Sequence, residues 1–254
     1  MSNEVIVEVV DGTQVITINR PEVRNAINLA TARALASALE ELDERKEVTV
    51  GILTGAGSTF CAGMDLKAFL AGERPTIPGK GFAGLVESPP KKPLIAAVEG
   101  AAVAGGFEIV LSCDLIVAAE NAIFGLPEVK RGLVAAGGGL LRLPSRIPYH
   151  LAMEWSLTGA NVMAQVAKDA QLVNLLTTPG ESLAGAFKLA RAICANGPLA
   201  VQATKEIITN SRDWPLSQAF ERQSVITEPV RASKDAREGA LAFTERRSPV
   251  WLGE

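Results

Sequence analysis

The first hydrophobic positions of the chain fall in two short β-rich runs, VIVEVV at residues 5–10 and TQVITI at residues 13–18. Asp11-Gly12 stands between them, and this dipeptide favours the tight turn of a two-residue hairpin. The pattern therefore predicts that a β-hairpin opens the fold.

After the second run, the spacing of the leucines changes. Leu35, Leu39 and Leu42 recur at the three- and four-residue intervals of a helix, and Asn28 is a residue type that caps helix N-termini. We expect an amphipathic helix that begins after Asn28 and reaches the charged segment 43–47.

The rest of the chain alternates strand-like and helix-like segments and then becomes helical. Strands are expected at residues 48–54, 94–98 and 113–118, and a buried helix from about Gly105. The segment 72–80 is rich in Pro and Gly and is expected to be mobile. Further helices are expected at 149–157, 163–170, 182–195, 199–209, 216–230 and 234–246. This pattern predicts an α/β core domain over residues 1–196 and a helical C-terminal region over 197–254.

Composition and charge exclude several classes of protein. The 254 residues are 48% hydrophobic with a net charge of −3, so we expect one large core and no basic surface for nucleic acid. The single histidine, His150, and the scattered Cys61, Cys113 and Cys194 do not match a zinc site, so no metal is expected. The cysteines suit a reducing compartment and the first ten residues do not resemble a secretory signal, so we expect a cytoplasmic protein.

The most apolar stretch, residues 93–119, is interrupted by Glu99, Glu108 and Asp114. Because each carboxylate would be costly in lipid, we interpret the stretch as protein core rather than a membrane span. Buried carboxylates are either hydrogen-bonded structural groups or functional ones. We assign Glu99 and Asp114 to the structural class.

Common nucleotide-binding and nucleophile motifs are incomplete here. Gly55-Ala56-Gly57 follows a strand, but Phe60 replaces the third glycine of a dinucleotide-binding fingerprint. Gly79-Lys80 lacks the Ser or Thr that a phosphate-binding loop requires. No G-x-S-x-G motif exists, and His150 is interpreted as a half-exposed residue at a helix start.

Two small-residue turns carry a more specific signal. FCAGMDLK at 60–67 and AGGFE at 104–108 each place a turn before a helix, where backbone amides can face a ligand. Two converging amides would form an oxyanion hole, with Glu108 and Glu128 as carboxylates beside it. Each feature alone also has a structural explanation: close helix packing for the glycines, a satisfied buried acid at Glu108, and pairing of Glu128 with Lys130 or Arg131.

Taken together, these segments resemble the crotonase (enoyl-CoA hydratase/isomerase) family. The resemblance rests on NRP at 19–21, RNAIN at 24–28, LTG at 53–55, CAGMDLK at 61–67, KPLIAAVEG at 92–100, GGFE at 105–108 and FGLPE at 124–128. A further set, GFAGL at 81–85, LRLP at 141–144 and FTERRSPVW at 243–251, resembles the carnitinyl-CoA dehydratase-like branch.

The resemblance implies an α/β crotonase (ClpP-like) fold of repeated β-β-α units with a C-terminal helical trimerisation region. It implies a homotrimer or a homohexamer built as a dimer of trimers, and a coenzyme A thioester as substrate, with no separate cofactor. By position, Met64 and Gly105 would supply the oxyanion-hole amides, and Glu108 and Glu128 match the two catalytic glutamates. Positions that match the coenzyme A or substrate site are Arg24, Ala26, Ala62, Asp65, Leu66, Lys67, Phe243 and Arg246. The resemblance implies that the last two can reach the ligand from a neighbouring subunit.

The function that follows is reversible hydration of a 2-enoyl-CoA. In this hypothesis Glu128 exchanges the proton at Cα and Glu108 orients the water. Alternatives are a dehydratase or isomerase on a specialised acyl-CoA such as a carnitinyl thioester, or a non-catalytic acyl-CoA-binding protein. The acyl pocket is expected from segments 72–86 and 130–139, where Val134-Ala135-Ala136 departs from the usual family pattern.

Overall fold

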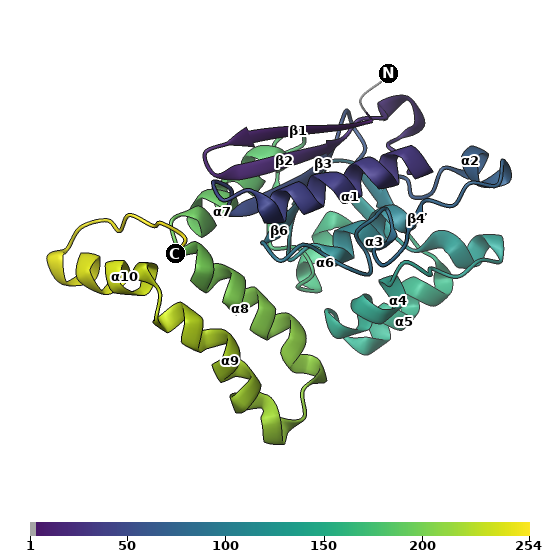
Figure 1. Ribbon diagram of the computed structural model, residues 1–254. Helices are drawn as coiled ribbons and strands as arrows, with labels where there is room; N and C mark the ends of the chain where they lie inside the picture. The colour runs from purple at the N-terminus through teal and green to yellow at the C-terminus, as the bar shows by residue number, and fades with distance from the viewer. Residues whose placement is uncertain (1–3) are drawn as a thin grey trace.

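A six-stranded sheet forms the centre of the computed structural model, which describes residues 4–254 (Figure 1). Its strand order is β1-β2-β3-β6-β8-β11, with β1–β2 antiparallel and the other pairs parallel. The strands are β1 Val5–Val10, β2 Thr13–Ile18, β3 Val50–Gly55, β6 Leu94–Val98, β8 Leu115–Ala119 and β11 Leu175–Thr177. The predicted hairpin is confirmed, because Val10 pairs with Thr13 across the Asp11-Gly12 turn.

A second, three-stranded sheet has the order β10-β9-β7, and β4 and β5 form a separate pair. These strands are β4 Thr76–Ile77, β5 Gly81–Phe82, β7 Ala101–Val103, β9 Ile123–Gly125 and β10 Val162–Met163. The consecutive pairs β6–β7 and β8–β9 each give one strand to the large sheet and one to the small sheet. Segment 72–80, expected to be mobile, contains β4 and the turn that leads into β5.

Ten α-helices are described in residues 4–254. They are α1 Leu29–Glu44, α2 Leu66–Leu70, α3 Gly105–Ser112, α4 Gly139–Arg142, α5 Tyr149–Thr158, α6 Ala164–Asp169, α7 Ser182–Cys194, α8 Pro198–Asn210, α9 Ala219–Arg231 and α10 Lys234–Glu245. Single 3-10 turns are η1 Pro21–Val23, η2 Pro127–Arg131, η3 Leu143–Ser145, η4 Ser211–Asp213 and η5 Leu216–Gln218. Asn28 caps α1 as predicted, since its side chain accepts a hydrogen bond from the Thr31 amide.

Several predicted boundaries are wrong by a few residues, each for a local reason. Cys113 is the C-cap of α3, so β8 begins only at Leu115. Met163 belongs to β10 because it pairs with Ile123. The helix expected from Leu216 is divided into the turn η5 and the helix α9.

Both faces of the large sheet are covered, as a mainly parallel sheet requires. Helix α7 packs Ala186 and Ala190 on the face that carries Ile52 and Ile95. Leu53, one residue on, points to the opposite face, where α1 packs its leucines. Strand β3 and α1 approach closely at Gly51, where a Cβ would lie 2.6 Å from Leu42 Cδ2. This close approach fixes the end of α1 against the start of β3.

The last three helices extend away from the sheets as an arm, drawn in green to yellow in Figure 1. No residue of α8 or α9 is buried, and the arm exposes the large apolar side chains of Ile208, Leu216, Phe220, Val225 and Phe243. The end of the chain returns toward the core, where Trp251 Nε1 donates to the Ala195 carbonyl at 2.9 Å. The arm is therefore attached to the core near Ala195, and its large apolar side chains are exposed.

Glu99 and Asp114 are less buried than expected: Glu99 is half-buried and Asp114 is exposed. Both still make structural contacts. Glu99 accepts the amides of Gly180 and Ser182 before α7, and Asp114 accepts the Leu94 amide and pairs with Lys205 at 2.6 Å. No helix in the described residues is long and apolar enough to cross a membrane.

Candidate active site

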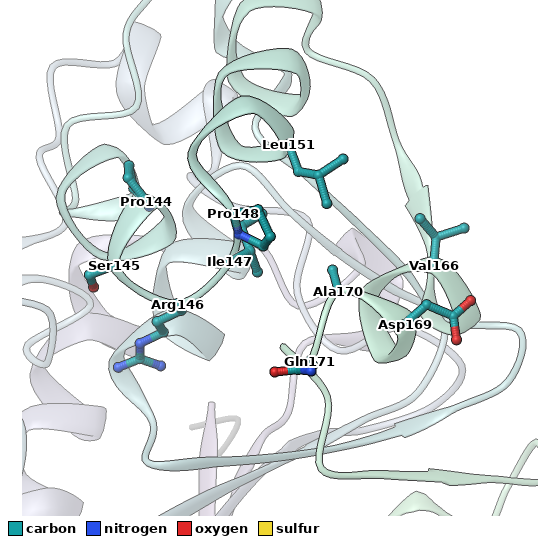
Figure 2. Close-up of a pocket in the computed structure, with 10 residues that line it drawn as sticks. All are labelled: Pro144, Ser145, Arg146, Ile147, Pro148, Leu151, Val166, Asp169, Ala170 and Gln171. Carbon is teal, nitrogen blue, oxygen red and sulfur yellow. The ribbon is translucent and has the colours of Figure 1, made fainter.

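A cavity of about 550 Å³ lies where the α2 loop, the start of α3 and the η2 segment meet. Predicted site residues from all three elements line it: Ala62, Met64, Leu66, Gly105, Glu108 and Glu128. A second cavity of about 540 Å³ lies beside α5 and α6, and Figure 2 shows its lining side chains. None of the predicted site residues lines that second cavity, so the first cavity is the candidate active site.

The Met64 amide is isolated by the hydrogen bonding of its neighbours. Ala62 N donates to the Arg24 carbonyl at 3.0 Å, and Asp65 N donates to the Ile27 carbonyl at 2.9 Å. Gly63 N lies 3.3 Å from Cys61 Sγ. In the described part of the chain, no protein acceptor faces the Met64 N–H. This amide is therefore available to a ligand in the cavity.

The Gly105 amide begins α3 and is likewise without a protein acceptor among residues 4–254. Ala104 before it adopts φ 52° and ψ −131°, a conformation unusual for an L-residue, and it directs the first N–H of the helix. The two turns touch, because a Cβ on Gly63 would lie only 3.0 Å from Gly105 N. Two free amides thus meet at a helix N-terminus, which favours developing negative charge.

Glu108 lies one turn into α3 and is 4% exposed. Its Oε1 accepts the Gly139 amide at 3.0 Å. The 137–139 loop approaches so closely that a Cβ on Gly137 would lie 2.5 Å from Glu108 Oε2. Burial raises the pKa of the Glu108 carboxyl, although the amides of Gly139 and Gly137 and the charge of Arg142 oppose that rise.

Glu128 enters the cavity from η2, which Pro127 begins. Its Oε2 is buried and has no hydrogen-bond partner among the described residues. Burial raises the pKa of the Glu128 carboxyl, and the nearby charge of Glu108 adds to the rise. A buried carboxylate oxygen without a protein partner is suited to accept a proton or to hold water.

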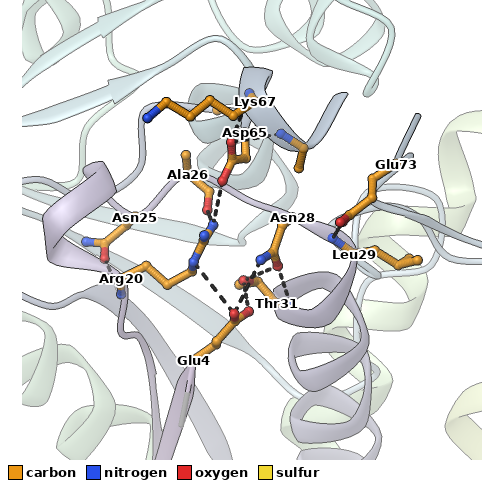
Figure 3. A network of polar contacts seen from close by, with 12 residues as sticks. Glu4, Arg20, Asn25, Ala26, Asn28, Leu29, Thr31, Asp65, Lys67 and Glu73 are labelled. Carbon is orange, nitrogen blue, oxygen red and sulfur yellow. Dashed lines mark hydrogen bonds and ion pairs between the residues drawn. The ribbon is translucent and has the colours of Figure 1, made fainter. Parts of the chain in front are cut away.

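The expected coenzyme A positions are brought together only in part. Arg24 and Ala26 lie on the segment that pairs with residues 62–65, and Figure 3 shows Asp65 and Lys67 beside it. In contrast, α10 with Phe243 lies at the far end of the arm from α2 (Figure 1). Phe243 is 86% exposed, and Arg246 follows as the C-cap of α10. Within one chain these two residues do not reach the cavity.

Some cavity residues were not singled out from the sequence. The expected acyl-pocket segments do supply Phe82, Val86, Leu133 and Val134, but Phe69 and Glu87 also line the cavity. Phe69 faces the cavity because α2 begins at Leu66, and this starting residue sets which side of the helix Phe69 occupies. The sequence alone does not specify where α2 begins. His150 is exposed beside Tyr149 and lines neither cavity.

Comparisons with known proteins point in one direction. A family model described as enoyl-CoA hydratase/isomerase matches residues 8–254. The chain is 42% identical over 248 residues to a protein named enoyl-CoA hydratase EchA19 from Mycobacterium tuberculosis, covering 93% of this chain and 92% of that protein. It is also 42% identical over 247 residues to a carnitinyl-CoA dehydratase of Salmonella typhi, covering 94% of each.

Solved structures agree. The crystal structure of enoyl-CoA hydratase EchA1 from Mycobacterium marinum matches with a TM-score of 0.97 and 57% identity over 99% of both chains. That of carnitinyl-CoA hydratase from Mycobacterium avium matches with a TM-score of 0.80 and 40% identity over 100% of both chains. These matches extend over the core and the arm alike.

Proposed function

The chain belongs to the enoyl-CoA hydratase/isomerase family, and on that premise we propose that it reversibly adds water to a 2-enoyl-CoA thioester. The expected α/β crotonase fold is confirmed by the structural matches. One observation carries the proposal: two carboxylates, the buried Glu108 and the half-buried Glu128, line the same cavity as the free amides of Met64 and Gly105.

In the proposed reaction the thioester oxygen accepts hydrogen bonds from the Met64 and Gly105 amides. Attack of water at Cβ moves electron density onto that oxygen, so the amides bind the transition state more strongly than the substrate. Glu108 orients the water, whose hydroxyl forms the new bond to Cβ. Its remaining proton passes to the carboxylates, and Glu128 delivers a proton to Cα. The raised pKa values of both carboxyls support these roles, since they bring proton exchange closer to neutral pH.

The adjoining groove is proposed to hold coenzyme A, which enters as part of the substrate. Arg24 and Lys67 are exposed cations on its two facing segments and suit the phosphates of the nucleotide. No metal or redox cofactor is proposed, because amides and carboxylates suffice for this addition.

A neighbouring subunit is proposed to complete the site with Phe243 and Arg246, in a homotrimer or dimer of trimers in the cytoplasm. The exposed apolar side chains of α8 and α9 support this role for residues 197–254, because a bare apolar face favours a protein partner.

A second candidate activity is dehydration or isomerisation of a specialised acyl-CoA, favoured by the 42% identity to a carnitinyl-CoA dehydratase. A non-catalytic acyl-CoA-binding protein is disfavoured, because a binder needs the amides and the groove but not a carboxylate pair. A panel of thioesters compared by kcat/KM separates the first two activities.

Crotonyl-CoA hydration by the wild type, Glu108→Gln and Glu128→Gln tests the proposal. We expect each variant to lose at least about a hundredfold in kcat. Glu99→Gln is the control, because Glu99 is a half-buried carboxylate that does not line the cavity. If wild-type turnover is no higher than that of either cavity variant while thioesters still bind, the enzyme hypothesis fails and the chain is an acyl-CoA-binding protein.

A further inference from the structure

Arg20 lies outside the cavity, yet it joins the two chain segments that hold the Met64 amide. Its Nη1 donates to the Ala26 carbonyl and lies 3.1 Å from Asp65 Oδ2 (Figure 3). Ala26 precedes Ile27, the bridge partner of Met64, and Asp65 follows Met64 directly. One guanidinium thus connects both sides of the bridge that orients the free amide.

Asp65 uses its other oxygen to begin α2. Oδ1 accepts the amides of Lys67 at 3.1 Å and Ala68 at 3.2 Å, while Oδ2 faces Arg20. Burial alone would raise the pKa of the Asp65 carboxyl, but the Ala68 amide and the Arg20 guanidinium hold it below its ordinary value. The carboxylate is therefore ionised at neutral pH and shared between the helix cap and the ion pair.

Arg20 is itself held from the opposite side. Its Nε lies 3.8 Å from Glu4 Oε1, and Glu4 Oε2 accepts the Thr31 hydroxyl at 2.5 Å at the start of α1. The side chains of Arg20 and Asp65 are only 14% and 13% exposed, so solvent screens this pair less than it would a surface pair. The Arg20 guanidinium thus contacts the residues that precede β1 and α2, and Glu4 links it to the start of α1.

The geometry points to Arg20 as a positioning residue for the oxyanion hole: its ion pair with Asp65 sets the direction of the Met64 amide. Hydrogen-bond donors stabilise an oxyanion only when they are already aimed at it, so an error in direction weakens the transition state more than substrate binding. The inference rests on the proposed function for its kinetic readout and needs a second readout that does not involve turnover.

The experiment compares Arg20→Gln, Arg20→Lys and Asp65→Asn with the wild type. A dimethylaminocinnamoyl-CoA thioester supplies the second readout, because its absorption moves to the red when its carbonyl is polarised. We expect Arg20→Gln and Asp65→Asn to lower kcat about tenfold to a hundredfold, with KM changed less than about threefold, and to reduce the red shift. Arg20→Lys keeps the charge and should restore part of both signals.

Lys205→Gln is the matched control. Lys205, whose side chain is 14% exposed like that of Arg20, forms an ion pair with Asp114, which follows α3 at the end opposite Gly105. This variant should lower the melting temperature and leave kcat and the red shift unchanged. Should Arg20→Gln fail to fold, the nearly isosteric Asp65→Asn decides the question, since its amide oxygen can still cap α2.

Full red shift and full kcat in the folded Arg20 and Asp65 variants would overturn the inference, as would losses no larger than those of Lys205→Gln. If the wild type shifts the chromophore but does not hydrate crotonyl-CoA, the proposed function fails for that substrate while the red shift still tests the role of Arg20.

Discussion

Gly137→Ala should impair the reaction while leaving the fold intact. The added Cβ would lie 2.5 Å from Glu108 Oε2 and 2.9 Å from Cδ, whereas ordinary contact begins at 3.4 Å. The carboxylate must therefore retreat by about 0.9 Å, and it can do so because it ends a flexible side chain. The backbone does not oppose the substitution, because Gly137 does not have a positive φ.

A displacement of about 1 Å in a catalytic group costs about a hundredfold in rate, or about 2.7 kcal/mol of transition-state stabilisation. The stability change should stay within about 1 kcal/mol, a shift of about 2–4 °C in melting temperature for a chain of this size. Gly197→Ala is a matched control, because its added Cβ would make only ordinary contacts with Trp251 at 3.6 Å or more.

The assay is crotonyl-CoA hydration, with the substitution also placed in the Glu108→Gln background. Because the added methyl acts through the Glu108 carboxylate, Gly137→Ala should have little further effect there. An undiminished kcat in the single variant, or an equal loss in both backgrounds, would refute this account of Glu108 positioning.

Three further predictions follow from particular contacts. Burial raises the pKa of Glu128 above its ordinary 4.5, so its ionisation in the folded state costs stability as pH rises from about 4.5 through the raised value. Glu128→Gln should therefore raise the melting temperature at pH 7, with the gain fading toward pH 4 in thermal scans. Asp235 accepts the amides of Leu252 at 2.7 Å and Gly253 at 3.0 Å, so Asp235→Ala should cost about 1–3 kcal/mol or release the C-terminal segment to limited proteolysis. Phe220 is 77% exposed on α9, and Phe220→Asp should lower the mass seen by light scattering if this face binds a second subunit.

The sequence predicts the parts of the fold that have a long or chemically distinct signal. The β1–β2 hairpin and α1 are of this kind, with Asp11-Gly12 and Asn28 as local markers. Strands β7, β9 and β10 are only two or three residues long, too short for alternation to be recognised. Strands β7 and β9 follow β6 and β8 directly, and β10 forms by pairing with β9, so all three depend on the tertiary structure.

The same distinction applies to the candidate site. Local turns predict the free amides with Glu108 and Glu128 beside them, and the family resemblance implies that these two carboxylates are catalytic. Gly137 and Gly139 both lie close to the Glu108 carboxylate, and the hydrogen bond from the Gly139 amide to Glu108 joins residues 31 positions apart. No local sequence pattern predicts this contact. The hydrogen bond from Arg20 to Asp65 joins residues 45 positions apart. It bears on the Met64 amide only because Ile27 and Met64 pair in the folded chain.

The contact between Gly63 and the Ala104-Gly105 turn bears on how such an enzyme can change over generations. Since a side chain on Gly63 would collide with both Ala104 and Gly105 N, mutations in these two turns must be strongly epistatic. Phe82, Leu133 and Val134 line the cavity from other segments, so substitutions there do not affect the contact between the two turns. Substrate preference can therefore change through single substitutions of cavity-lining residues, while the two turns that hold the oxyanion-hole amides must be retained together.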